Sequence, residues 1–260
     1  MYRVIELFSG VGAQRMAFNK VSELTGIEFE FVAQCDIDKF AVKSYNAIHG
    51  ETPNLGDITK VERLPECDIL TWSFPCQAIS QAGKKEGMKQ DSGTTSSLAW
   101  EVIRLLEKAN PRPEWLIMEN VRAITYSRNI KEFNKIINAL NCLGYYSKYK
   151  VINALDFDVA QDRERCFMIS HHGKPVHDFP PAIGCRHTLE DYLESDIDPR
   201  YFLSSKRLQN MIVSSERERE RKETDLFLSQ PQRTESPIRS LQNQPGNTPP
   251  LSKRGARNDS

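Results

Sequence analysis

The chain has 260 residues, enough for one α/β domain and a smaller appendage. Its 35 basic and 35 acidic side chains cancel, so a nucleic-acid partner would need a local basic face. There is no apolar run of about 18 residues and no secretory leader, so we expect neither a membrane span nor a signal peptide. Six scattered cysteines without a CxxC pair favour a reduced, cytoplasmic protein.

Short apolar runs alternate with helical patterns over most of the chain. Such alternation is typical of an α/β fold with a doubly wound, mostly parallel sheet, in which ligands bind at the carboxyl ends of the strands. The expected strands are 4–8, 29–35, 68–73, 115–118, 145–152 and 166–170. The expected helices are 13–24, 39–48, 98–108 and 130–143.

The pattern changes near residue 175, so we predict one domain over residues 1–175 and a smaller region over 176–225. Residues 229–260 contain four aliphatic side chains among five prolines, with many Gln, Ser, Asn and Arg. That composition cannot offset the entropy lost on ordering, and we predict a disordered tail over 226–260.

The first expected strand ends in FSGVGAQ, where Gly10 and Gly12 would let the backbone approach a ligand. The full GxGxxG is absent, so a plain strand-to-helix turn is an equal interpretation. Asp36 follows the second strand, where a carboxylate can bind ribose hydroxyls; Asp38 is the alternative, or a helix N-cap. Asp57, in GDIT, is expected at another strand end facing an adenine amine, although such residues are commonly turn formers.

A cysteine stands directly after the next strand, in SFPCQAIS. Cys76 follows a proline turn at the carboxyl edge of the sheet, where exposure and nearby helix N-termini favour a thiolate. The stretch that follows is rich in Gly, Lys and Ser, and it is expected to form a loop that closes over a substrate. The other five cysteines are interpreted as core or incidental residues.

Two further polar motifs flank the later strands. Glu119, in MENV, is expected at the same edge as Cys76, where partial burial would raise its pKa and make it a general acid. Arg163 and Arg165 alternate in QDRERCF, so both are expected on one face, as a buried pair suited to carbonyl or phosphate recognition. Solvated surface charge is the alternative. The histidines and Cys185 lack the spacing of a zinc site, and no metal is expected.

These motifs, in this order, resemble the cytosine-C5 DNA methyltransferase family of bacteria and phages. FSGVGAQ is similar to its cofactor motif, SFPCQ to its nucleophile motif, MENV to its glutamate motif and QDRER to its arginine motif. The resemblance implies a methyltransferase fold that binds S-adenosylmethionine. The cofactor-binding residues that it implies are Phe8, Gly10, Gly12, Asp36, Ile37, Asp57 and Leu98.

The resemblance also implies a reaction. Cys76 would attack C6 of a cytosine flipped out of double-stranded DNA, and Glu119 would protonate N3. Arg165 would contact the cytosine O2, and Arg163 would help to place Cys76 and Glu119. Members of the family commonly belong to restriction-modification systems, which implies a possible partner endonuclease and a monomeric enzyme.

The C-terminal part departs from the family pattern. Residues 176–225 are expected to form a partial target recognition region, and 244–248 only weakly resemble the last family motif, so an incomplete C-terminus is expected. Two alternatives to a DNA methyltransferase stay open. One is an RNA cytosine-C5 methyltransferase, and the other is an inactive remnant that binds cofactor or nucleic acid weakly.

Overall fold

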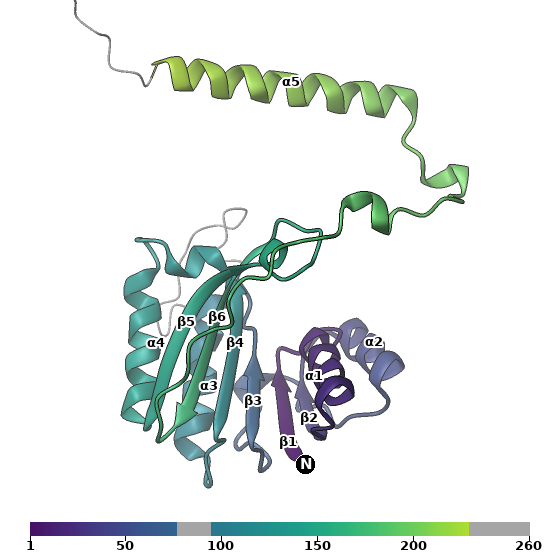
Figure 1. Cartoon of the computed structure of the whole chain (residues 1–260). Coiled ribbons are helices and arrows are strands. Elements are labelled where there is room, and N and C mark those ends of the chain that lie inside the picture. The colour runs from purple at the N-terminus through teal and green to yellow at the C-terminus, as the bar shows by residue number, and fades with distance from the viewer. Residues whose placement is uncertain (77–94, 229–260) are drawn as a thin grey trace, which may run out of the picture. The chain divides into compact units, whose positions relative to one another are not determined.

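A six-stranded sheet, with helices packed on it, organises the N-terminal part of the protein (Figure 1). The computed structural model describes residues 1–76 and 95–228. The strand order is β2-β1-β3-β4-β6-β5. The strands are β1 (Tyr2–Leu7), β2 (Phe29–Cys35), β3 (Ile69–Trp72), β4 (Trp115–Val121), β5 (Tyr145–Asn153) and β6 (Glu164–His172).

The direction of the strands confirms the predicted mostly parallel α/β fold, with one reversed strand. Strand β1 is parallel to β2 and β3, and β3 is parallel to β4. Strand β6 lies between β4 and β5 and is antiparallel to both. The strand–helix alternation therefore stops at β5, and the first residues of β6 lie at the edge where the parallel strands end.

Four α-helices accompany the sheet close to their predicted positions, and a fifth, α5, lies in the C-terminal part of the described residues, where no helix of this length was predicted. Helix α1 packs on β2, and helix α4 packs on β5 and α3. The helices are α1 (Ala13–Thr25), α2 (Lys39–His49), α3 (Ala99–Lys108), α4 (Ile130–Cys142) and α5 (Ser205–Leu228). Short 3-10 helices span Ile58–Lys60, Thr95–Leu98, Arg122–Thr125, Ala154–Asp156, Leu189–Tyr192 and Pro199–Tyr201.

The hydrophobic core lies between the sheet and its helices. Strand β3 is buried at all four positions, as expected of a central parallel strand that is covered on both faces. Helix α3 buries an apolar stripe in this core, which includes Val102, Leu105 and Leu106. The largest fully buried side chain is Trp72, at the end of β3. The carboxyl edge is therefore built on rigid, packed strands.

The chain divides into two compact units, Met1–Leu193 and Glu194–Ser260. The first contains the whole sheet, and helix α5 belongs to the second. The domain limits at residues 175 and 225 stay predictions, and most of the predicted tail, residues 229–260, lies outside the described residues. Within the described part of the chain, no helix combines the length and apolar character that a membrane crossing requires.

Candidate active site

The turn after β1 has an unusual backbone. Phe8, Gly10 and Gly12 all have positive φ values, of 58°, 54° and 81°. For the half-buried Phe8 this left-handed conformation costs roughly 1–2 kcal/mol, and such strain concentrates at functional sites. A Cβ at Gly12 would lie 2.3 Å from the His49 ring, whereas a Cβ at Gly10 would meet no atom within 4 Å. Packing therefore explains Gly12, while Gly10 borders open space.

Asp36 lies against this turn. Its Oδ2 accepts a hydrogen bond from the Gly10 N–H at 2.9 Å, and its Oδ1 accepts one from the Asp38 N–H at 2.9 Å. Asp38 instead caps helix α2, where its Oδ1 accepts from the Phe40 and Ala41 N–H groups. Ile37, between the two aspartates, is 76% exposed. The structure thus brings Asp36 to the glycine turn and assigns Asp38 a capping role.

The expectation that Asp57 lies at the end of a strand is wrong. It caps the 3-10 helix Ile58–Lys60, and its Oδ1 accepts from the Thr59 N–H and hydroxyl. The Thr59 hydroxyl, followed by the Thr59 N–H, lowers the pKa of the Asp57 carboxyl. Asn54, which the sequence analysis missed, connects this segment to the turn because it exchanges two hydrogen bonds with the Asp36 backbone. Isolated polar loop residues carry no periodic signal that reveals such contacts.

Cys76 follows β3 on a segment that is held from two sides. The Gln14 amide, on the first turn of α1, donates to the Ser73 hydroxyl at 2.7 Å. The Phe74 carbonyl accepts from the Asn120 side chain at 3.0 Å. Cys76 is a free, half-buried thiol that packs against the core. The expected closing loop begins directly after it, but residues 77–94 lie outside the described residues.

Glu119 and Arg165 form an ion pair across β4 and β6. The Arg165 Nε and Glu119 Oε1 are 3.1 Å apart, and their side chains are 23% and 27% exposed. The strand register explains this contact: Val121 lies opposite Arg165, so Glu119 is its diagonal neighbour on the same face. The reversed direction of β6 places Arg165 at the edge where β4 ends.

The prediction that Arg163 is buried together with Arg165 is wrong. Its side chain is exposed, because the residue lies in the loop before β6 begins at Glu164. Its backbone is fixed, since the Arg163 N–H donates to the Asn153 side chain at 3.1 Å. Only Arg165 is half-buried and contacts Glu119.

Glu6 is a buried acid beneath the glycine turn, and the sequence analysis missed it. It is 1% exposed, and burial raises its pKa to about 7, although Tyr45 and the Gln14 and Arg15 N–H groups stabilise the carboxylate. A charged residue inside the apolar run VIELF was the available signal. Glu6 thus binds the N-terminus of helix α1, where a negative charge is favourable.

Leu98 precedes helix α3 and packs half-buried against the core.

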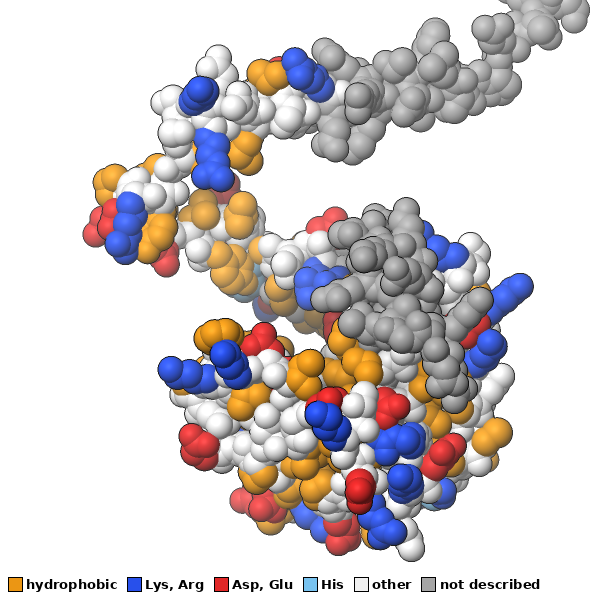
Figure 2. Space-filling view, turned by 180° about the vertical axis from the view of Figure 1, so that it is seen from behind, with side chains coloured by type: hydrophobic (Ala, Val, Ile, Leu, Met, Phe, Trp, Pro, Cys, Tyr) orange, Lys and Arg blue, Asp and Glu red, His pale blue; other side chains and the backbone are white. Residues whose placement is uncertain are grey.

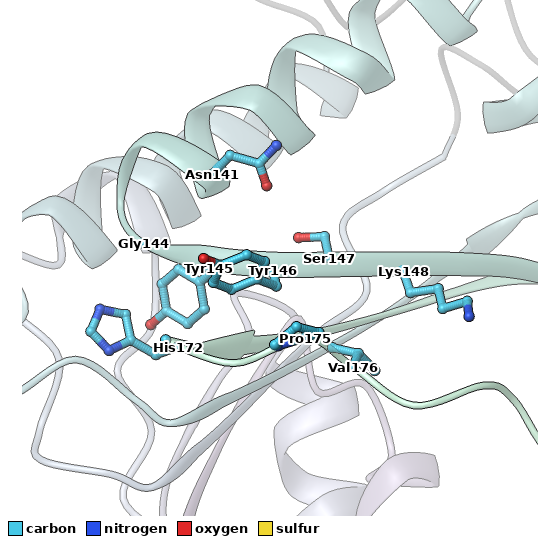
Figure 3. Close-up of a pocket in the computed structure, with 10 residues that line it drawn as sticks. Asn141, Gly144, Tyr145, Tyr146, Ser147, Lys148, His172, Pro175 and Val176 are labelled. Atoms are coloured by element: carbon cyan, nitrogen blue, oxygen red, sulfur yellow. The ribbon is translucent and has the colours of Figure 1, made fainter.

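A separate cavity of about 720 Å³ lies where β5 begins and β6 ends (Figure 3). Tyr145 and His172, which line it, are paired at the end of the β5–β6 ladder opposite to Arg165. It contains none of the predicted site residues. No group of His, Cys, Asp or Glu among the described residues has the arrangement of a metal site.

Comparison with known proteins identifies the family. The model of the C-5 cytosine-specific DNA methylase family matches residues 2–255. The chain belongs to this family. It is 34% identical over 212 residues to the type II methyltransferase M1.ScrFI of Lactococcus lactis subsp. cremoris, covering 79% of this chain and 52% of that protein. The type II methyltransferase M.HaeII of Haemophilus aegyptius is 36% identical over 207 residues, covering 78% of this chain and 61% of that protein.

Solved structures show the same fold. The Entamoeba histolytica methyltransferase EhMeth superposes with a TM-score of 0.63 at 22% identity, covering 79% of this chain and 64% of that one. The Dnmt2 methyltransferase of S. pombe has a TM-score of 0.61 at 23% identity, covering 80% and 64%. The chain spans about half the length of the first curated relatives that it matches.

Proposed function

We propose that this member of the methylase family is the catalytic part of a DNA cytosine-C5 methyltransferase. The observation that carries the proposal is the meeting of three motifs at one edge of the sheet. The Cys76 segment is bonded to Asn120, which is the neighbour of Glu119, and Glu119 is paired with Arg165. A thiol, a carboxyl group and a guanidinium on packed strands suit nucleophilic attack on a planar, carbonyl-bearing ring.

The residues at the neighbouring turn fit S-adenosylmethionine. Gly10 borders open space, Asp36 faces the same turn, and the exposed Ile37 offers an apolar surface to an adenine ring. Phe8 lies at the start of this turn, and Gly12 allows α1 to begin there. Asp57 and Leu98 complete the proposed set. When bound, this cofactor supplies the methyl group.

In the proposed mechanism the residues of this chain activate and hold the cytosine. Cys76 Sγ forms a bond to C6 while Glu119 delivers a proton to N3, which makes C5 nucleophilic. Arg165 holds the Glu119 carboxyl and reaches the cytosine O2. After C5 has gained the methyl group, a base removes the C5 proton, the Sγ–C6 bond breaks to release Cys76 as a thiolate, and N3 returns its proton to Glu119.

The substrate that we propose is double-stranded DNA with the target cytosine flipped out, because Cys76 cannot reach C6 inside a base stack. The exposed Arg163 lies at the same edge, where we propose that it helps to place Cys76 and Glu119. On the face shown in Figure 2, basic and acidic side chains are interspersed, so any basic DNA-binding face has to be local. We also propose that the enzyme is monomeric and cytoplasmic, and that it acts beside a partner endonuclease.

Bisulfite sequencing of DNA from cells with and without the expressed gene tests the activity. The expected result is protection of cytosines at one recurring sequence when the gene is expressed. An unchanged pattern, with the protein present and folded, would contradict the DNA methyltransferase proposal, and the same assay on cellular RNA would then test the RNA alternative.

A further inference from the structure

Asn120 connects the two catalytic motifs. Its side chain is 3% exposed, and Nδ2 donates to the Phe74 carbonyl at 3.0 Å. Its Oδ1 accepts from the Val121 N–H at 2.9 Å, which holds the amide in one orientation. Both functions of the amide are therefore used, and in a buried setting neither has water as a substitute partner.

The position of this bond matters for geometry. Phe74 precedes Cys76 by two residues and is itself buried, whereas Asn120 is adjacent to Glu119. The bond spans 46 positions in the sequence and connects the end of β3 to the end of β4. The pairing of β3 with β4 ends at Trp72, and this hydrogen bond holds the chain that follows. It therefore sets the spacing between the Cys76 and Glu119 backbones.

We propose that Asn120 is a positioning residue that holds the Cys76 segment in register with Glu119. The effect of Asn120 on catalysis rests on the proposed function, because it requires Cys76 and Glu119 to act together. The Asn120 side chain bonds to the backbone of Phe74 and Val121, and the proposed mechanism assigns it no contact with the reacting atoms. It acts through the Phe74 carbonyl, and without its donor the half-buried Cys76 moves outward from the core.

Asn120→Asp is the test variant because it keeps the shape and the acceptor but loses the N–H donor. We expect two opposite effects. Neutral iodoacetamide should alkylate Cys76 severalfold faster, measured by peptide mass spectrometry against the exposed Cys142 in the same molecule. DNA methylation should fall in kcat by about 10²-fold, the cost typical of a displacement of about 1 Å, with little change in KM.

The chain offers a matched control in Asn129. This residue is also buried, at 5% exposure, and its Nδ2 donates to the Ala123 carbonyl at 2.7 Å. Asn129→Asp removes the same type of bond from a segment that does not carry Cys76. It should lower the melting temperature in a similar way while the Cys76 alkylation rate stays at the parent value.

A pH series separates positioning from general damage. At low pH the new carboxyl of Asn120→Asp is protonated and can again donate to the Phe74 carbonyl. The ratio of the Cys76 alkylation rate in the variant to that in the parent should therefore return towards one as pH falls. If Asn120→Asp does not fold, Asn120→Ser, which buries no charge and is too short to reach Phe74, should give the same faster alkylation.

Two results would overturn the proposal. One is parental Cys76 alkylation in a folded Asn120 variant, and the other is an equal acceleration in Asn129→Asp. A parent protein that methylates no DNA would count against the proposed function alone, because the alkylation experiment measures the position of Cys76 without DNA or cofactor.

Discussion

At the scale of single residues, Cys76 and Glu119 carry different parts of the proposed chemistry. Cys76→Ser should abolish methylation because no covalent route to C6 remains. Glu119→Gln should keep a slow residual rate, since a positioned general acid typically contributes about 10²–10⁴-fold. Single-turnover methylation assays measure both, with Cys142→Ser on the exposed face of α4 as the control that should match the parent.

Covalent trapping tests the nucleophile directly. DNA with 5-fluorocytosine cannot lose its C5 substituent as a proton, so the parent protein should stay attached through Cys76 when S-adenosylmethionine is present. A denaturing gel should show a cofactor-dependent shifted band. The same band in Cys76→Ser would identify a different nucleophile.

Asp36 tests the cofactor site. Asp36→Ala should weaken S-adenosylmethionine binding by roughly 1–3 kcal/mol, the cost of leaving ribose hydroxyls without a partner. Asp38→Ala is the matched control, because Asp38 caps α2. It should lower the melting temperature and leave the affinity unchanged. Calorimetry that finds equal affinities for Asp36→Ala and the parent would refute this assignment.

At the scale of elements, Glu6 joins β1 to the start of α1. Burial raises its pKa from the ordinary 4.5 to about 7, so the folded state holds the Glu6 proton more tightly than the unfolded state. The stability that this proton provides is complete below about pH 4.5 and is lost as pH rises towards 7. The titratable groups around Glu6 are the charged Arg15 and the neutral Tyr45, and Arg15 donates to the Tyr45 hydroxyl at 3.3 Å.

The unfolding free energy of Glu6→Gln should therefore change less with pH than that of the parent. Between pH 4.5 and 7 the parent should lose on the order of 3 kcal/mol of unfolding free energy relative to the variant, from 1.36 kcal/mol for each pKa unit. Urea unfolding at several pH values measures this difference. Parallel stability curves for the two proteins would show that Glu6 does not titrate in this range.

At the scale of the whole molecule, the sheet and its core belong entirely to the unit Met1–Leu193. A protein of residues 1–193 should therefore fold by itself and unfold cooperatively at nearly the temperature of the full chain. Circular dichroism and calorimetry of both proteins measure this. A shortened protein that lacks cooperative unfolding would show that the second unit contributes to the core.

The sequence by itself determined the order and type of the strands of the sheet and of helices α1 to α4, because hydrophobic periodicity reports which face of each element is buried. It also determined the family, through short motifs whose spacing is specific. The strand-end position expected for Asp57 and the burial expected for Arg163 were wrong because both residues lie in loops, where no periodicity indicates a neighbour or exposure. Only the tertiary structure decided that β6 runs backwards, that Glu119 meets Arg165, and that Asn120 reaches Phe74 across 46 positions. The physical reason is that these contacts form between distant segments only when the core packs, whereas local sequence patterns describe one segment at a time.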